Sequence, residues 1–140
     1  MKAHIARTPR VVLAWDLPEG SVSRTALNDT AARLGMTVNA VDAAHLNSNI
    51  AGLCGLPIPP YAVNPLFERT DFAPAAVFCG LNDRELDQAL SDLRDAGADI
   101  PLKAVVTPTS QGWTLAQLLR ELSAERDAFA AGQAAVHSED

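Results

Sequence analysis

The 140-residue sequence lacks any long apolar run and has little positive charge. No stretch approaches the roughly 20 apolar residues that a membrane-spanning helix needs. Seventeen acidic residues against eleven lysines and arginines give a net charge of −6, whereas a nucleic-acid-binding surface needs a basic stripe. The same charge disfavours an anionic membrane surface. We therefore expect neither a membrane nor a nucleic acid as the partner.

Cysteines and recognised catalytic motifs are also scarce. Two cysteines, Cys54 and Cys79, are too few for a disulfide framework in a chain of this size, so we expect partly buried free thiols. The basic N-terminus has no apolar segment behind it, unlike a secretory signal, and we expect a cytoplasmic protein. The sequence contains no glycine-rich phosphate loop, metalloprotease helix motif or nucleophile elbow. We therefore expect no cofactor and no metal.

Apolar residues make up 48% of the chain, which is ordinary for a globular protein with a buried core. Residues 1–129 are expected to form a single domain, and the small, polar residues at 130–140 are expected to fray. Residues 55–74 are rich in proline and have no regular period, which predicts an extended excursion. Its aromatic residues Tyr61, Phe67 and Phe72 predict that this excursion packs on the domain.

The clearest local signals lie in residues 82–122. Asn82 and Glu85 have the spacing of a capping box at the start of a helix with leucines on one face. The run Leu102–Val106 is apolar, contains adjacent valines and lies between prolines, which predicts a strand. Thr114 then begins another helix with the same cap spacing. The stretch is therefore a helix, a strand, a turn and a helix.

Residues 11–55 show the same order of strand, helix, glycine, strand and short helix. Val11–Leu17 and Met36–Val41 are predicted strands of a first βαβ unit, and Ala75–Cys79 is the predicted first strand of a second unit. Two such units predict an α/β fold of the α+β two-layer sandwich type. It would have a four-stranded sheet resembling a ferredoxin-like sandwich, plus a C-terminal helix. The alternative is a fully parallel sheet with helices on both faces.

One motif in residues 82–122 also resembles a known family. The pattern L-K-A-V-V-T-P-T-x-x-x-W-T-L-x-x-L-L-x-E-L follows an acidic helix ending in Ala-Gly, and the resemblance is sharpest over Phe78–Glu125. It is similar to a family of small bacterial and archaeal proteins known as a domain of unknown function. In that family an asparagine often takes the place of Ser110 and a histidine that of Arg126. The resemblance implies a compact α/β domain with no established activity.

The turn before the last predicted helix is a candidate ligand site. Thr107, Thr109 and Ser110 place hydroxyls and backbone amides near a helix start, which can hold an anion. Lys103 in the preceding strand and Trp113 after the turn complete the set, which would sense a phosphate or a nucleotide. Ordinary turn chemistry explains the same hydroxyls without a ligand. Lys103 also suits a sheet edge, and Trp113 suits a core position.

Other candidate residues lie near the ends of the predicted strands. Cys79 precedes a helix start, an environment that can stabilise a thiolate, and Cys54 shares its Cys-Gly-Leu context. The two could form a redox couple or be core thiols. Asp42 and His45 could form an acid–base pair or be solvated loop residues. Asp16 lies where α/β folds place ligand crevices, although it also suits an ordinary turn.

Because no catalytic cluster stands out, we expect a non-enzymatic binding, regulatory or protein-interaction domain. Its partner would be another protein, a second copy of the chain in a homodimer, or a small anionic ligand. Phosphate or nucleotide sensing at residues 107–114 is one alternative. A cysteine-based redox protein that uses Cys79 is the other.

Overall fold

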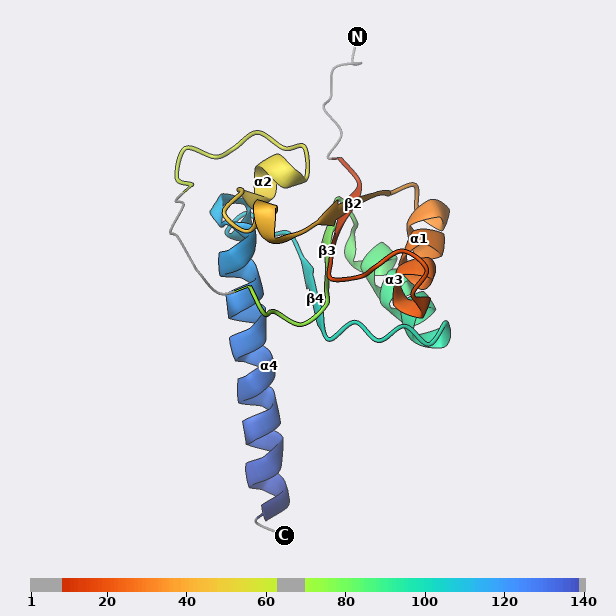
Figure 1. The fold of residues 1–140 in the computed structure, drawn as a ribbon, viewed down its shortest axis with the longest axis vertical. Helices are drawn as coiled ribbons and strands as arrows, with labels where there is room; N and C mark the ends of the chain where they lie inside the picture. The colour runs from red at the N-terminus through yellow and green to blue at the C-terminus, as the bar shows by residue number, and fades with distance from the viewer. Residues whose placement is uncertain (1–8, 63–69, 139–140) are drawn as a thin grey trace.

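The computed structural model describes residues 9–62 and 70–138, with side chains up to residue 130. Single 3-10 turns lie at Ala43–His45 and Ser110–Gly112. The main elements are β1 Val11–Trp15, α1 Val22–Arg33, β2 Thr37–Val41, α2 Ile50–Leu53, β3 Ala75–Cys79, α3 Asp83–Asp95, β4 Leu102–Val105 and α4 Leu115–Ser138. Figure 1 shows these elements gathered into one body from which α4 projects.

The four strands form one mixed sheet in the order β2-β1-β3-β4. β1 is parallel to β2 and β3 is parallel to β4, so each pair and its intervening helix form one βαβ unit. The units meet along β1 and β3, which are antiparallel, with Val11 opposite Cys79 and Trp15 opposite Ala75. The predicted four-stranded sheet built from two βαβ units is confirmed, and the fully parallel alternative is wrong.

The ferredoxin-like strand order is not confirmed. A split βαβ unit places another strand between its two parallel strands. Here β1 and β2 are direct neighbours, and so are β3 and β4. The sequence pattern does not distinguish the two arrangements, because both contain the same elements in the same order along the chain.

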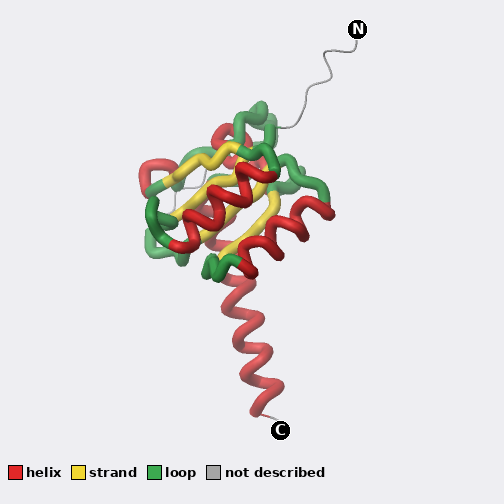
Figure 2. The backbone as a smooth tube through the Cα atoms, turned by 90° about the vertical axis from the view of Figure 1, so that its right-hand side faces the viewer, coloured by secondary structure: helices red, strands yellow, loops and turns green. Residues whose placement is uncertain are grey.

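Side chains of the central strands alternate between two covered faces of the sheet. Val12, Ala14 and Phe78 belong to the core beneath α1 and α3, which form the helical layer expected for the sandwich (Figure 2). Leu13 and Val77 face the opposite side, where α2 and the first turns of α4 pack. Burial on both faces explains why β1 and β3 are continuous apolar runs.

The predicted capping box at the start of α3 is present and is tied to β1. Asn82 Oδ1 accepts a hydrogen bond from Glu85 N at 2.8 Å, and Glu85 Oε1 accepts one from Asn82 N at 3.1 Å. Glu85 Oε2 also lies 2.6 Å from Arg10 Nη2. Since Arg10 Nε donates to Leu34 O at 3.0 Å, one guanidinium joins the start of β1 to the end of α1 and the start of α3.

Glu85→Gln is expected to lower the free energy of unfolding at neutral pH. The hydrogen bond from Arg10, and then that from Asn82 N, hold the pKa of Glu85 below its ordinary value of 4.5. A carboxyl group with a depressed folded-state pKa adds stability above its unfolded pKa, and this stability disappears as pH falls through the folded pKa. The free energy of unfolding measured in urea should therefore be lower for the variant than for wild type at neutral pH. The two values should converge in acid, below the ordinary pKa of glutamate. An equal difference in the free energy of unfolding at both pH values would contradict the view that the charge of Glu85 provides the stability.

α4 packs on the body only through its first half. Leu115, Leu119 and Ser123 are buried, whereas residues 124–130 are all exposed and the helix leaves the body there (Figure 1). The backbone stays helical to Ser138, and the expected fraying of residues 130–140 stays a prediction. Within the described ranges, no helix is long and apolar enough to cross a membrane.

The proline-rich excursion contacts the body near both of its ends. Tyr61 Oη donates a hydrogen bond to Pro108 O at 2.6 Å, and the buried Phe72 meets the ring of Trp15. Phe67 lies outside the described residues. These contacts support the packed excursion at 55–74 and the single-domain organisation, which both stay predictions.

Candidate functional site

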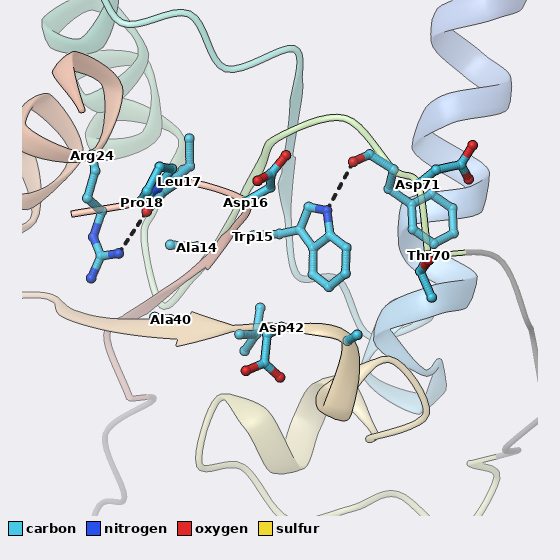
Figure 3. Close-up of a pocket in the computed structure, with 13 residues that line it drawn as sticks. Ala14, Trp15, Asp16, Leu17, Pro18, Arg24, Ala40, Asp42, Thr70 and Asp71 are labelled. Carbon is cyan, nitrogen blue, oxygen red and sulfur yellow. Dashed lines mark hydrogen bonds between the residues drawn. The ribbon is translucent and has the colours of Figure 1, made fainter. Parts of the chain in front are cut away.

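A pocket opens at the edge of the sheet where β1 and β2 end. Because the two strands are parallel, their last residues, Trp15 and Val41, lie at the same edge, where α/β sheets commonly place ligand sites. The pocket has a volume of about 610 Å³, within the range of small-molecule sites. Its walls are residues 14–18 together with Arg24, residues 40–43 and residues 70–72 (Figure 3).

Asp16 follows the last residue of β1 and lines the pocket with an unusual backbone conformation. Among the described residues it is the one non-glycine with a positive φ, at 55°. The left-handed conformation costs an L-residue about 1–2 kcal/mol, although aspartate adopts it more readily than most. Its exposed side chain has no hydrogen-bond or ion-pair partner among the described residues. The strain at Asp16 is therefore not explained by a side-chain contact within this part of the chain.

Trp15 connects the end of β1 to the wall formed by residues 70–72. Its Nε1 donates a hydrogen bond to Phe72 O at 3.2 Å, drawn as a dashed line in Figure 3. The two rings meet edge to face, with centroids 6.3 Å apart and planes at 71°. Thr70 and Asp71 are exposed beside them. Trp15 thus fixes the position of a wall that comes from a distant part of the chain.

Arg24 lies on the opposite wall and is engaged by the fold. It is 9% exposed, and its Nη1 donates to Leu17 O at 2.9 Å while its Nε donates to Asn28 Oδ1 at 3.1 Å. Glu19 Oε1 lies 3.6 Å from Nε. Arg24 therefore holds the turn after β1 against the first turns of α1, and Glu19 partly balances its charge.

Three exposed aspartates line the pocket, one from each wall: Asp16, Asp42 and Asp71. Arg24 is the single cationic side chain among the described lining residues, and it is largely buried. The accessible charge of the pocket is therefore negative. Within the described part of the chain, no group of three or more histidine, cysteine, aspartate or glutamate residues is arranged to hold a metal ion.

Asp42 and His45, the suggested acid–base pair, form a reciprocal cap after β2. Asp42 Oδ1 accepts a hydrogen bond from Ala44 N at 2.9 Å and lies 3.0 Å from His45 Nδ1. Asp42 N also lies 3.1 Å from that ring nitrogen. The amide donates to Nδ1 when the nitrogen carries no proton, and the carboxylate accepts from it when it does. Both arrangements cap the 3-10 turn, and the acid–base role stays a prediction.

The structure brings Thr107 and Ser110 together, and the hydroxyl of each residue accepts a hydrogen bond from the backbone amide of the other. Thr107 N donates to Ser110 Oγ at 2.9 Å, and Ser110 N donates to Thr107 Oγ1 at 3.1 Å. Ser110 is 4% exposed. Two of the amides that an anion would use are therefore already paired, as expected for ordinary turn chemistry.

The other predicted ligand residues lie in different places. Lys103 is near the start of β4, and its Nζ donates to Ile100 O at 2.7 Å, whereas the turn follows the end of that strand. Thr109 and Trp113 line a second pocket of about 440 Å³ together with Tyr61. The structure thus does not gather the five predicted residues into one site.

Cys54, which follows α2, and Cys79, which ends β3, lie in the same buried cluster although they are far apart in the chain. Both side chains are buried, and each thiol affects the pKa of the other. The thiol of Cys54 lowers the pKa of Cys79, against the effect of burial. The thiol of Cys79, reinforced by burial, raises the pKa of Cys54. Cys79 is therefore the sulfur of the pair that more readily becomes a thiolate.

Sequence reasoning did not find the pocket wall at Thr70 and Asp71. These residues end a proline-rich excursion, and only the fold returns them to the end of β1. One feature of the sequence pointed to Asp16 and Trp15 as pocket residues, namely their position at the end of a predicted strand. A nearby proline turn explained the same residues without a ligand.

Comparison with known proteins bears on the second βαβ unit. Residues 74–129 match the family model described as Domain of unknown function (DUF3783). The match covers β3, α3, β4 and the packed part of α4, and it leaves β1, α1, β2 and all the lining residues of the pocket outside. Comparisons with curated proteins and with solved structures found no match. The resemblance to a domain of unknown function is thereby supported over residues 74–129, the part of this chain that matches the DUF3783 model.

Proposed function

We propose that this protein is a non-enzymatic binding domain whose ligand occupies the pocket at the ends of β1 and β2. The observation that carries the proposal is Asp16, which combines a left-handed backbone with an exposed carboxylate beside a cavity of about 610 Å³. Strained residues cluster at ligand sites because the surrounding structure holds them in place. The location at the carboxyl ends of two parallel strands supports the same site.

The ligand that we propose is a small molecule with an amine or guanidinium group. Carboxylates accept hydrogen bonds and bind cationic donors through charge-assisted contacts. Asp16 and Asp42 supply such acceptors from two walls, whereas the cationic Arg24 is held by Leu17 O. This charge differs from that of the small anionic ligand expected from the sequence, whose proposed place is the 107–114 turn.

The two tryptophans report separately on the two candidate sites. The Trp15 indole lines the pocket at the strand ends, and the Trp113 indole lines the pocket beside the 107–114 turn. Each indole N–H gives its own signal in a nitrogen–proton correlation NMR spectrum. Trp113→Phe assigns the two signals, because it removes one of them.

Titration with agmatine, which carries both an amine and a guanidinium group, is expected to shift the Trp15 signal and leave that of Trp113 in place. Asp16→Asn should weaken binding roughly tenfold or more, because a hydrogen bond to a charged group contributes about 1.5–3 kcal/mol. Asp95→Asn is the matched control, since Asp95 is an exposed carboxylate at the end of α3, outside the pocket lining.

The opposite pattern would favour the alternative site. If ATP or inorganic phosphate shifts Trp113 and the amides of residues 107–110 while agmatine leaves Trp15 unchanged, the pocket proposal fails and anion sensing gains support. Equal binding by wild type and Asp16→Asn would also contradict the role of Asp16.

Recognition of a protein partner is the second form of binding that we propose. Ile58, Tyr61 and Phe129 are large apolar side chains that are more than half exposed. Phe129 is an exposed residue of α4 that lines a surface pocket together with Pro101 and Leu102. Homodimer formation and the cytoplasmic location stay predictions of the sequence.

A further inference from the structure

Two cysteine–glycine turns converge on one point of the core. Cys54 follows α2 and Cys79 ends β3, and each precedes a glycine with a left-handed backbone. A Cβ added to Gly55 would lie 3.8 Å from Pro9 Cγ, and one added to Gly80 would overlap Pro9 O. Both turns therefore lie against the same proline, which places the end of α2 beside the end of β3.

The cysteine side chains of these turns share one apolar cluster. Cys54 is 1% exposed and Cys79 is 2% exposed, and each thiol is close enough to shift the pKa of the other. Cysteines that the fold places in one cluster need little rearrangement to form a bond, whereas cysteines held far apart require backbone movement. The segment between them, residues 55–78, contains the pocket wall at residues 70–72.

We propose that Cys54 and Cys79 form a reversible intramolecular disulfide that joins the end of α2 to the end of β3 and so closes the part of the chain that carries the pocket wall at residues 70–72. The inference rests on the meeting of the two turns and does not depend on the proposed ligand. The oxidant is a low-molecular-weight disulfide of the glutathione type.

The exchange proceeds in two steps that balance atoms and electrons. The Cys79 thiolate attacks one sulfur of the small disulfide, which forms a mixed disulfide and releases one small thiolate. Cys54 then loses its proton and attacks the Cys79 sulfur, which expels the second small thiolate. Two electrons pass from the cysteine sulfurs to the reagent, and the two cysteine protons end on the two small thiols. A small dithiol or excess small thiol reverses both steps.

The assignment of Cys79 as the first nucleophile follows from the mutual effect of the two thiols, which lowers the pKa of Cys79 and raises that of Cys54. The lower pKa of Cys79 favours the thiolate that attacks. Because both sulfurs are buried, the rate of the first step is set by local opening around α2, which is a single short helical turn. We therefore expect slow labelling by thiol reagents in the folded protein and faster labelling after mild denaturation.

The test uses the full chain, reduced and then incubated with glutathione disulfide under native conditions. The expected product is a monomer that has lost two hydrogens, with a link between the peptides containing Cys54 and Cys79 in a non-reducing digest. Closing a loop of this length should raise Tm by about 10 °C, and dithiothreitol should restore the original value. Cys54→Ala and Cys79→Ala should each abolish both the link and the rise in Tm.

Three results would overturn the proposal, and none of them requires the variants to fold. The folded wild type could retain two thiols after prolonged exchange. It could stop at a stable glutathione adduct or link to a second chain. It could form the internal disulfide in urea alone, which would show that the native thiols are not positioned to join.

Discussion

Gly80→Ala is expected to lower the free energy of unfolding by about 3 kcal/mol, because the substitution combines two penalties. Gly80 has φ of 90°, a conformation that an alanine adopts at a cost. The added Cβ would also overlap Pro9 O and lie 3.1 Å from Arg10 Cα, which are backbone atoms and not flexible side-chain ends. Chemical denaturation of the variant measures the loss.

Gly97→Ala separates the two penalties. Gly97 also has a left-handed backbone, with φ of 77°, but a Cβ there would meet no atom within 4 Å. This control is expected to lose about 1 kcal/mol, the cost of the backbone conformation alone. The difference between the variants reports how tightly the strand β1 is held against the end of β3. Equal losses would show that residues 9–10 can move away without penalty.

Phe78→Ala is expected to have the largest effect of any single substitution considered, a loss of about 3–5 kcal/mol. Phe78 is 0% exposed in the central strand β3, and it fills the core between the sheet and the layer of α1 and α3. Its Cα is opposite Val12 in β1 and Val105 in β4, so neighbours on both sides hold the backbone in place. Partial collapse into the space left by the ring is therefore restricted.

The measurement is unfolding in urea or guanidinium, from which the midpoint of the transition and the slope of the free energy against denaturant concentration are obtained. Phe129→Ala is the matched control, because Phe129 is 68% exposed and its truncation should change stability by no more than about 0.5 kcal/mol. An unchanged slope with a lower midpoint is expected for Phe78→Ala. A loss below about 1 kcal/mol would mean that α1 and α3 close over the vacated volume.

Local signals in the sequence predicted the elements well. The caps at Asn82 and Thr114 depend on atoms within one helical turn, and the structure shows both side chains accepting the predicted amide hydrogen bonds. The strands β1 and β3 are buried on both faces, so composition alone revealed them. These features were predictable because residues close in the chain determine them.

Features that depend on distant residues were not predictable. The second neighbour of β1, in addition to β2, is β3. This choice depends on packing across the whole sheet and not on any residue of β1. The pocket wall at Thr70 is placed by the hydrogen bond between Trp15 and Phe72 O. Lys103 and Ser110 are close in the chain, yet the direction of β4 separates the lysine from the turn. Sequence spacing carries no information on such distances.

The antiparallel joint between β1 and β3 has a consequence for synthesis on the ribosome. Val11 pairs with Thr37 on one side and with Cys79 on the other, so its second partner emerges more than twice as far along the chain. Until then β1 exposes a row of unpaired amides and carbonyls, which is the kind of edge that recruits strands of other chains. The nascent protein is therefore expected to be most prone to aggregation in the interval after β2 has emerged from the ribosome and before β3 has emerged.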